Sequence, residues 1–71
     1  MITPSLYPNP VLSDFNVDGF KYYQWTLKNT IGQIIKSGNH DNTNIQEVQS
    51  GFYFLEIKQN DQLINYRIIK Q

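Results

Sequence analysis

GFYFLEIK (residues 51–58) and LINYRIIK (residues 63–70) decide the fold of this chain, and the polar residues QNDQ (residues 59–62) join them. Both runs are rich in aromatic and β-branched residues, which favour strands, and an all-polar connection is typical of a turn. We therefore predict a β-hairpin with Asn60 and Asp61 as its two loop residues. This register places Ile57 opposite Ile64.

The side-chain period of two divides this hairpin into two faces. One face is entirely apolar and consists of Tyr53, Leu55, Ile57, Ile64, Tyr66 and Ile68. The other face mixes apolar, polar and charged residues, namely Phe52, Phe54, Glu56, Asn65, Arg67 and Ile69. A shift of one residue would pair Leu55 with Arg67 and mix the faces, so the pattern favours the predicted register. The apolar face needs a second layer, which the rest of the chain must supply.

Length, composition and charge restrict the classes of function. A chain of 71 residues makes one small domain, which buries only about 60% of its unfolded surface. Six basic and six acidic residues cancel, so the chain lacks the positive charge that binds nucleic acid. We find no basic amphipathic helix and no apolar run near the roughly 18 residues of a membrane span, so membrane insertion is not expected. Without cysteine, disulfides and thiolate chemistry are excluded.

The N-terminus carries no pattern typical of a signal peptide. Two interpretations stay open: a cytoplasmic protein, or a piece of a longer precursor with Met1 added for expression. The prolines at 4, 8 and 10 suggest a linker that enters a domain, which favours a piece. We therefore expect residues 1–4 to be a linker or a remnant, and residues 5–71 to form the domain.

A second hairpin is expected over residues 21–36. Its first strand alternates well and places Tyr23, Trp25 and Leu27 on one face. Residues 29–32 make a tight connection in which Gly32 suits a positive φ. Residues 34–37 return, and a bulge at Gly32 would decide whether Ile34 or Ile35 faces Leu27, so this register stays open.

The remaining segments supply short strands and turns. Prolines restrict residues 5–10 to an edge strand or an extended cross-over at most, while Ile45 and Val48 provide the apolar contacts of a short strand and turn within residues 43–48. Six or seven short strands at spacings of about 8–12 residues predict an all-β sandwich. The opposing layer is expected to contain Phe15, Val17, Tyr23, Trp25, Leu27, Ile34 or Ile35, and Ile45.

Side chains suited to chemistry are few and scattered. His40 and Asp41, within the loop HDNTN (residues 40–44), are too few ligands for zinc or calcium. The carboxylates are spread singly over turns and strand faces, and so small a sandwich has little room for a cleft. We predict no catalytic residue, no metal and no cofactor.

Some aromatic residues have two interpretations. Phe20, Tyr22, Phe52 and Phe54 do not all fit on the core face. They either form an exposed strip that binds sugar rings or a protein partner, or belong to a thin sandwich in which both faces of the central strand are partly covered.

Five sequence segments occur in one order. LYPNPV (residues 6–11) precedes SDFNV (residues 13–17), and a strand ends in NTIGQII (residues 29–35). VQSGFYFLEI (residues 48–57) and RIIK (residues 67–70) follow. In this order and spacing the chain resembles the type A C-terminal sorting domain of proteins that Bacteroidetes-type bacteria export through the type IX (Por) secretion system.

The resemblance implies an immunoglobulin-like β-sandwich without catalytic residues. It also implies a function: the domain directs an N-terminal cargo, absent from this chain, through the outer-membrane translocon to the cell surface or medium, via the periplasm. In many relatives a cell-surface sortase then cleaves just before the domain. A terminal strand with a free edge is a reasonable feature for a partner to bind.

The resemblance carries over to named positions. The translocon is implied to recognise Arg67, Ile68, Ile69, Lys70 and Gln71. The structural residues of the family motif are Tyr7, Pro8, Asn9, Pro10, Gly32, Gly51 and Tyr53. The family often has Lys in place of Arg67, which keeps the charge but changes the hydrogen-bond geometry.

Two other functions stay open from the sequence. One is an accessory sandwich of an extracellular protein that binds carbohydrate or protein through its aromatic residues. The other is a stand-alone cytoplasmic structural domain.

Overall fold

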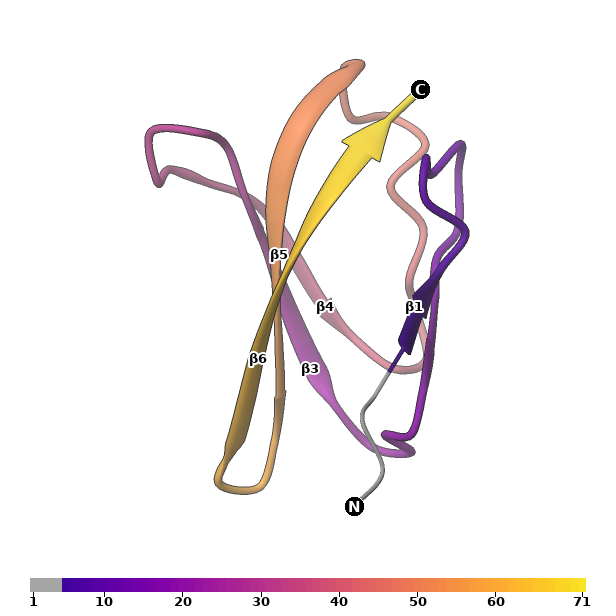
Figure 1. Cartoon of the computed structure of the whole chain (residues 1–71), viewed down its shortest axis with the longest axis vertical. Coiled ribbons are helices and arrows are strands. Elements are labelled where there is room, and N and C mark those ends of the chain that lie inside the picture. The colour runs from indigo at the N-terminus through magenta and orange to yellow at the C-terminus, as the bar shows by residue number, and fades with distance from the viewer. Residues whose placement is uncertain (1–4) are drawn as a thin grey trace.

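The computed structural model describes residues 5–71, and in this range all regular structure is β-strand. The strands are β1 (Ser5–Tyr7), β2 (Asn16–Asp18), β3 (Gln24–Lys28), β4 (Ile34–Asn39), β5 (Gly51–Gln59) and β6 (Gln62–Lys70). β1 pairs with β2, and the other four form an antiparallel sheet in the order β4-β3-β5-β6 (Figure 1). The prediction of a linker or remnant at residues 1–4 lies outside the described residues.

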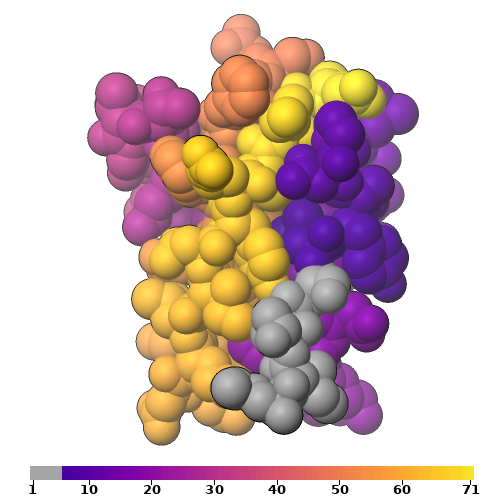
Figure 2. All heavy atoms as spheres, viewed as in Figure 1, coloured from indigo at the N-terminus to yellow at the C-terminus, as the bar shows by residue number. Residues whose placement is uncertain are grey.

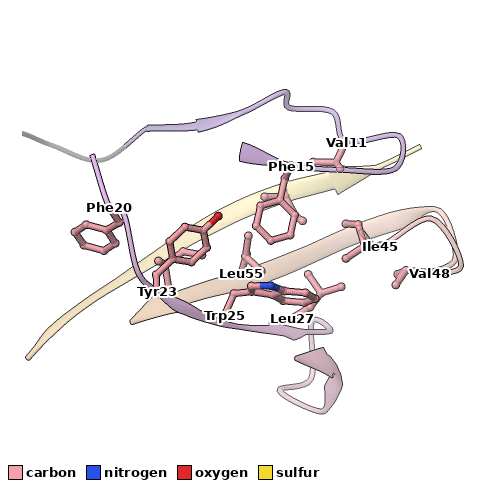
Figure 3. Packing of buried hydrophobic residues seen from close by; sticks show 11 residues of the cluster. Val11, Phe15, Phe20, Tyr23, Trp25, Leu27, Ile45, Val48 and Leu55 are labelled. Carbon is pink, nitrogen blue, oxygen red and sulfur yellow. The ribbon is translucent and has the colours of Figure 1, made fainter. Parts of the chain in front are cut away.

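Two layers enclose one core. The N-terminal layer, residues 5–18, crosses one face of the four-stranded sheet, and Phe15 and Val11 point from it toward Trp25 and Leu55 (Figure 3). The loop before β5 joins this layer, since Phe15 N donates to Thr43 O and Ile45 N donates to Ser13 O. The protein is therefore all-β, and two packed sheets are consistent with the small immunoglobulin-like sandwich expected.

The β5–β6 hairpin has the predicted register. Ile57 pairs with Ile64, and the ladder continues without a break to Gly51 and Lys70. Asn60, a loop residue, has a φ of 55°, in the left-handed region that Asn tolerates better than most residues. Every residue of the apolar face is buried or packs against the core, namely Leu55, Ile57, Ile68, Tyr53, Ile64 and Tyr66.

Trp25 is the largest fully buried side chain and lies between the two layers. Phe15 meets it edge to face, with ring centroids 5.2 Å apart. The indole N–H donates to two carbonyls of the loop after β4, Asn39 O at 3.1 Å and Asn42 O at 2.9 Å. Gly38 is opposite on β4, where a Cβ would lie 2.8 Å from the indole. Trp25 thus packs the core and fixes the course of the loop.

The expectation that Ile34 or Ile35 joins the core is wrong, because both side chains are exposed. Lys36 pairs with Leu27, and the register shifts before Ile34 pairs with Lys28. The bulge therefore lies at Ile35 rather than at Gly32. Lys36 can occupy the inner position because its ammonium is paired: Nζ donates to Asn44 O at 2.7 Å and forms an ion pair with Glu47.

The Lys36–Glu47 pair makes the domain sensitive to acid. The hydrogen bond from Lys36 Nζ is the main cause that lowers the pKa of Glu47. The stabilisation is present above the ordinary glutamate pKa and is lost as the pH falls through the lowered value. We expect the thermal midpoint to fall with acid less steeply in Glu47→Gln than in the parent chain. Parallel acid slopes in circular dichroism melts would contradict this.

Three further expectations need correction. Phe20 is buried in the core and does not belong to any exposed strip. Residues 43–48 form no strand; a single antiparallel bridge joins Asp14 to Asn44, although Ile45 and Val48 are buried as expected. The predicted strand at residues 21–28 begins only at Gln24.

Candidate recognition site at the C-terminal strand

The five residues that were expected to carry recognition lie at the end of β6, and their side chains alternate. Ile68 and Lys70 turn toward the core, with exposed fractions of 1% and 5%. Arg67, Ile69 and Gln71 are exposed. The structure therefore leaves only these three side chains of the five open to a partner.

The outer edge of β6 is not free at this end, contrary to the expectation from the resemblance. The side-chain amide of Asn9 bridges two main-chain groups: Nδ2 donates to Arg67 O at 3.2 Å, and Oδ1 accepts from Ile69 N at 3.1 Å. Val11 N then donates to Ile69 O at 2.7 Å, and Gln71 N donates to Val11 O at 2.9 Å. Residues 9–11 thus act as a short parallel neighbour of β6.

The two prolines explain why the side chain of Asn9, and not the main chain alone, bonds to the edge of β6. Pro8 and Pro10 have no N–H to donate, so main-chain pairing alone would be incomplete across this segment. The Asn9 amide supplies one donor and one acceptor with the chemistry of a peptide group. Figure 2 shows the consequence: indigo atoms of the N-terminal layer lie directly beside the yellow end of β6. We call these four hydrogen bonds the edge clamp.

Two substitutions of Asn9 separate the bonds of the edge clamp. Asn9→Ala removes both side-chain bonds, whereas Asn9→Asp keeps an acceptor for Ile69 N–H and loses the donor to Arg67 O. We expect the Ile69 amide to exchange with solvent faster in Asn9→Ala but to stay protected in Asn9→Asp, with about 1 kcal/mol lost per neutral bond. Amide hydrogen exchange by NMR measures this, and equal Ile69 protection in all three chains would contradict the clamp.

An exposed patch surrounds Arg67 on the outer side of the sheet. Phe54 pairs with Arg67 across β5 and β6, and Phe52 pairs with Ile69. The exposed fractions of Phe52, Ile69 and Phe54 are 70%, 40% and 37%. A hollow of about 200 Å³ lies here, lined by Asn9, Phe52, Arg67, Ile68 and Ile69. We call Phe52, Phe54, Arg67 and Ile69 the outer-face patch.

The other polar residues singled out from the sequence form no reactive arrangement. His40 Nε2 lies 3.4 Å from Asp41 Oδ1 on the surface. Within residues 5–71, no three His, Cys, Asp or Glu side chains gather into a group that could hold a metal ion. The same range contains no helix with the length and hydropathy to cross a membrane.

Comparison with protein families identifies the chain. The model of the secretion system C-terminal sorting domain matches residues 5–71. The chain belongs to the type IX secretion sorting domain family. Such a sorting domain functions with the type IX secretion system, belongs to a secreted or cell-surface cargo protein, and comes from a family that is not enzymatic. A search of curated proteins found none that matches this sorting domain.

The residues expected to form the family motif take different places in this sorting domain. Gly32 has a φ of 89° in the β3–β4 turn, where a side chain would strain the backbone although space is open. The Tyr53 hydroxyl donates to Gln49 O at 2.8 Å and closes the turn before β5. Tyr7 is exposed next to the prolines.

Sequence reasoning missed two functional contributions in this region. Val11 appeared only as the last residue of LYPNPV (residues 6–11), yet it is fully buried and also pairs with β6. Asn9 was assigned to the motif without a role. The available signal was the pair of prolines that flanks a residue with both a donor and an acceptor in its side chain.

Proposed function

We propose that this sorting domain directs its cargo from the periplasm through the type IX outer-membrane translocon to the cell surface or medium. The match over residues 5–71 supports this most strongly. In the proposal the translocon binds the folded domain at the end of β6, and a surface sortase acts afterwards on the connection ahead of the domain. Residues 1–4 belong to that connection, and the domain itself catalyses nothing.

Recognition of the tail at residues 67–71 fits its two-sided character. Ile68 and Lys70 anchor the strand in the core, which holds the neighbouring side chains in fixed positions. Arg67, Ile69 and Gln71 face outward and are available to a partner. Exposed side chains on a rigid strand lose little conformational entropy on binding, and this favours affinity.

A reporter fusion tests this function. The full chain is fused to the C-terminus of a periplasmic reporter and produced in a type IX-competent bacterium and in the same strain without the translocon. We expect the reporter outside the cell only in the competent strain. The double variant Arg67→Glu with Ile69→Ser should stay in the periplasm, because two of the three exposed side chains of the tail change while the buried ones do not.

The control for this fusion is Lys58→Glu, which reverses an exposed charge on β5 away from the label. It should be exported like the parent chain. Periplasmic retention of the parent fusion in the competent strain would contradict the sorting function. Normal export of the double variant would contradict recognition through the tail.

An accessory module that binds carbohydrate is the second candidate. The observation in its favour is the exposure of aromatic rings on the outer face, with Phe52 as the most open. Binding on a glycan array that disappears in Phe52→Ala or Phe54→Ala would support this candidate.

A further inference from the structure

We propose that the partner in the secretion machinery binds the outer-face patch, and that it contributes a carboxylate flanked by apolar side chains. This inference rests on the proposed function and names the chemistry of the partner. It replaces a linear five-residue label with a surface built from two strands, β5 and β6. Phe52, far from the C-terminus in sequence, then becomes part of the recognition surface.

The edge clamp is the first reason to expect binding through side chains. A partner that added a strand to the end of β6 would need main-chain groups of Arg67, Ile69 and Gln71. Those groups already bond to Asn9 and Val11, so strand addition must first break the four bonds of the clamp. The outer face of the same residues requires no such rearrangement.

The composition of the outer-face patch is the second reason. Phe52, Ile69 and Phe54 lie on neighbouring strands and leave apolar surface open on one end of the sheet. The core clusters on the opposite face of the sheet. Aromatic residues and arginine are enriched among the residues that dominate protein–protein binding energy, and here they are adjacent. The patch therefore has the composition of a protein contact.

Charge selects the chemistry of the occupant. Two cations flank Phe54 in the paired row across the sheet, Lys28 on β3 and Arg67 on β6. Lys28 forms an ion pair with Glu56 at 3.4 Å. Arg67 forms no ion pair with any residue in the range 5–71, so the unpaired charge of the patch is positive. A carboxylate is the complement of this charge.

The hollow beside Arg67 is suited to receive that carboxylate. Its volume of about 200 Å³ is enough for one side chain, and Phe52 and Ile69 provide apolar walls. A positive side chain at this position attracts a carboxylate, and the guanidinium of Arg67 can bind it through two parallel hydrogen bonds. An aspartate or glutamate of the partner, next to an apolar side chain, matches both the apolar wall of the hollow and the positive charge of Arg67.

Export of the full-chain reporter fusion tests the patch. We expect Phe52→Ser and Arg67→Glu to lower the exported fraction about tenfold or more, the scale of a lost binding hot spot. Arg67→Lys should keep most export and Arg67→Gln should lose most of it, because the partner needs a positive charge. The matched control is Leu63→Ser, an exposed apolar residue at the other end of β6 that is expected to export normally.

A competition experiment separates binding from later steps. The free parent chain, produced in the periplasm, should reduce export of the fusion; free Leu63→Ser should compete equally, and free Phe52→Ser should not. Melting curves of the purified variants verify folding. The three substitutions of Arg67 leave the packed side chains intact. If Phe52→Ser does not fold, they show whether the outer-face patch binds the partner.

The outcomes distinguish the two proposals. Export of Phe52→Ser and Arg67→Glu at the parent level, with the parent exported, overturns the outer-face patch and leaves the sorting function intact. Equal export of Arg67→Gln and Arg67→Lys overturns the proposal that the partner contributes a carboxylate. Glycan binding that depends on Phe52, with no effect on export, assigns the patch to sugar instead. A parent fusion that stays in the periplasm overturns both.

Discussion

Replacing Trp25 with alanine is expected to remove most of the stability of this sorting domain. The indole is almost fully buried, packs edge to face on Phe15 and donates to two loop carbonyls. Truncation of a buried aromatic side chain costs about 3–5 kcal/mol. A domain of this size lies at the low end of the about 5–15 kcal/mol typical of folded proteins, so a large unfolded fraction is expected at 37 °C.

The Trp25→Phe variant separates packing from hydrogen bonding. It keeps an aromatic ring against Phe15 but loses the donor to Asn39 O and Asn42 O. We expect an intermediate loss of about 1–3 kcal/mol. Urea unfolding followed by far-UV circular dichroism measures both variants, since Trp25 is the only tryptophan and its fluorescence disappears with it. Tyr22→Ala, at an exposed ring, is the control, and an equal loss there would contradict the assignment.

Deleting residues 67–71 is expected to unfold the domain rather than merely remove a label. The deletion takes away Ile68, which is 1% exposed, and the partners of Asn9 and Val11 in the edge clamp. Loss of a buried isoleucine alone costs about 2–5 kcal/mol, and each lost hydrogen bond adds about 1 kcal/mol. We expect the truncated chain to lack a cooperative melting transition in circular dichroism.

A matched variant shows whether folding or recognition is affected. Arg67→Glu with Ile69→Ser changes exposed side chains of the same five residues and should melt cooperatively near the parent temperature. A truncated chain that melts like the parent would contradict the structural role of the tail. Loss of export after truncation would have two explanations, and this is why substitutions at exposed positions give the cleaner test of recognition.

The hairpin of β5 and β6 could be predicted from the sequence in detail. Its register follows from the polar turn at Asn60 and Asp61 and from a period of two that only one alignment satisfies. The same period determines which residues of the tail are exposed, since Arg67 and Ile69 share the face that points away from the core. This part of the candidate site therefore needed only local rules.

The features that the sequence did not predict share a physical cause. A bulge at Ile35 changes which residue faces the core, and the alternation of side chains in a short strand does not determine where a bulge forms. Lys36 lies on the inner side because Asn44 and Glu47, 8 and 11 residues later in an irregular loop, satisfy its charge. The edge clamp depends on a side chain that bonds to main chain 58 and 60 residues later. Contacts of this kind produce no periodic pattern of polar and apolar residues in the sequence.

The edge clamp also gives the sorting domain an order of events. Asn9 is synthesised 58 and 60 residues before its partners Arg67 and Ile69. The contact cannot form until translation has reached the end of β6, and pairing over such a separation is slow because the chain must first close a long loop. The closed domain thus exists only after β6 has been synthesised. A machine that recognises the folded form would therefore pass over chains whose synthesis stopped before the end of β6.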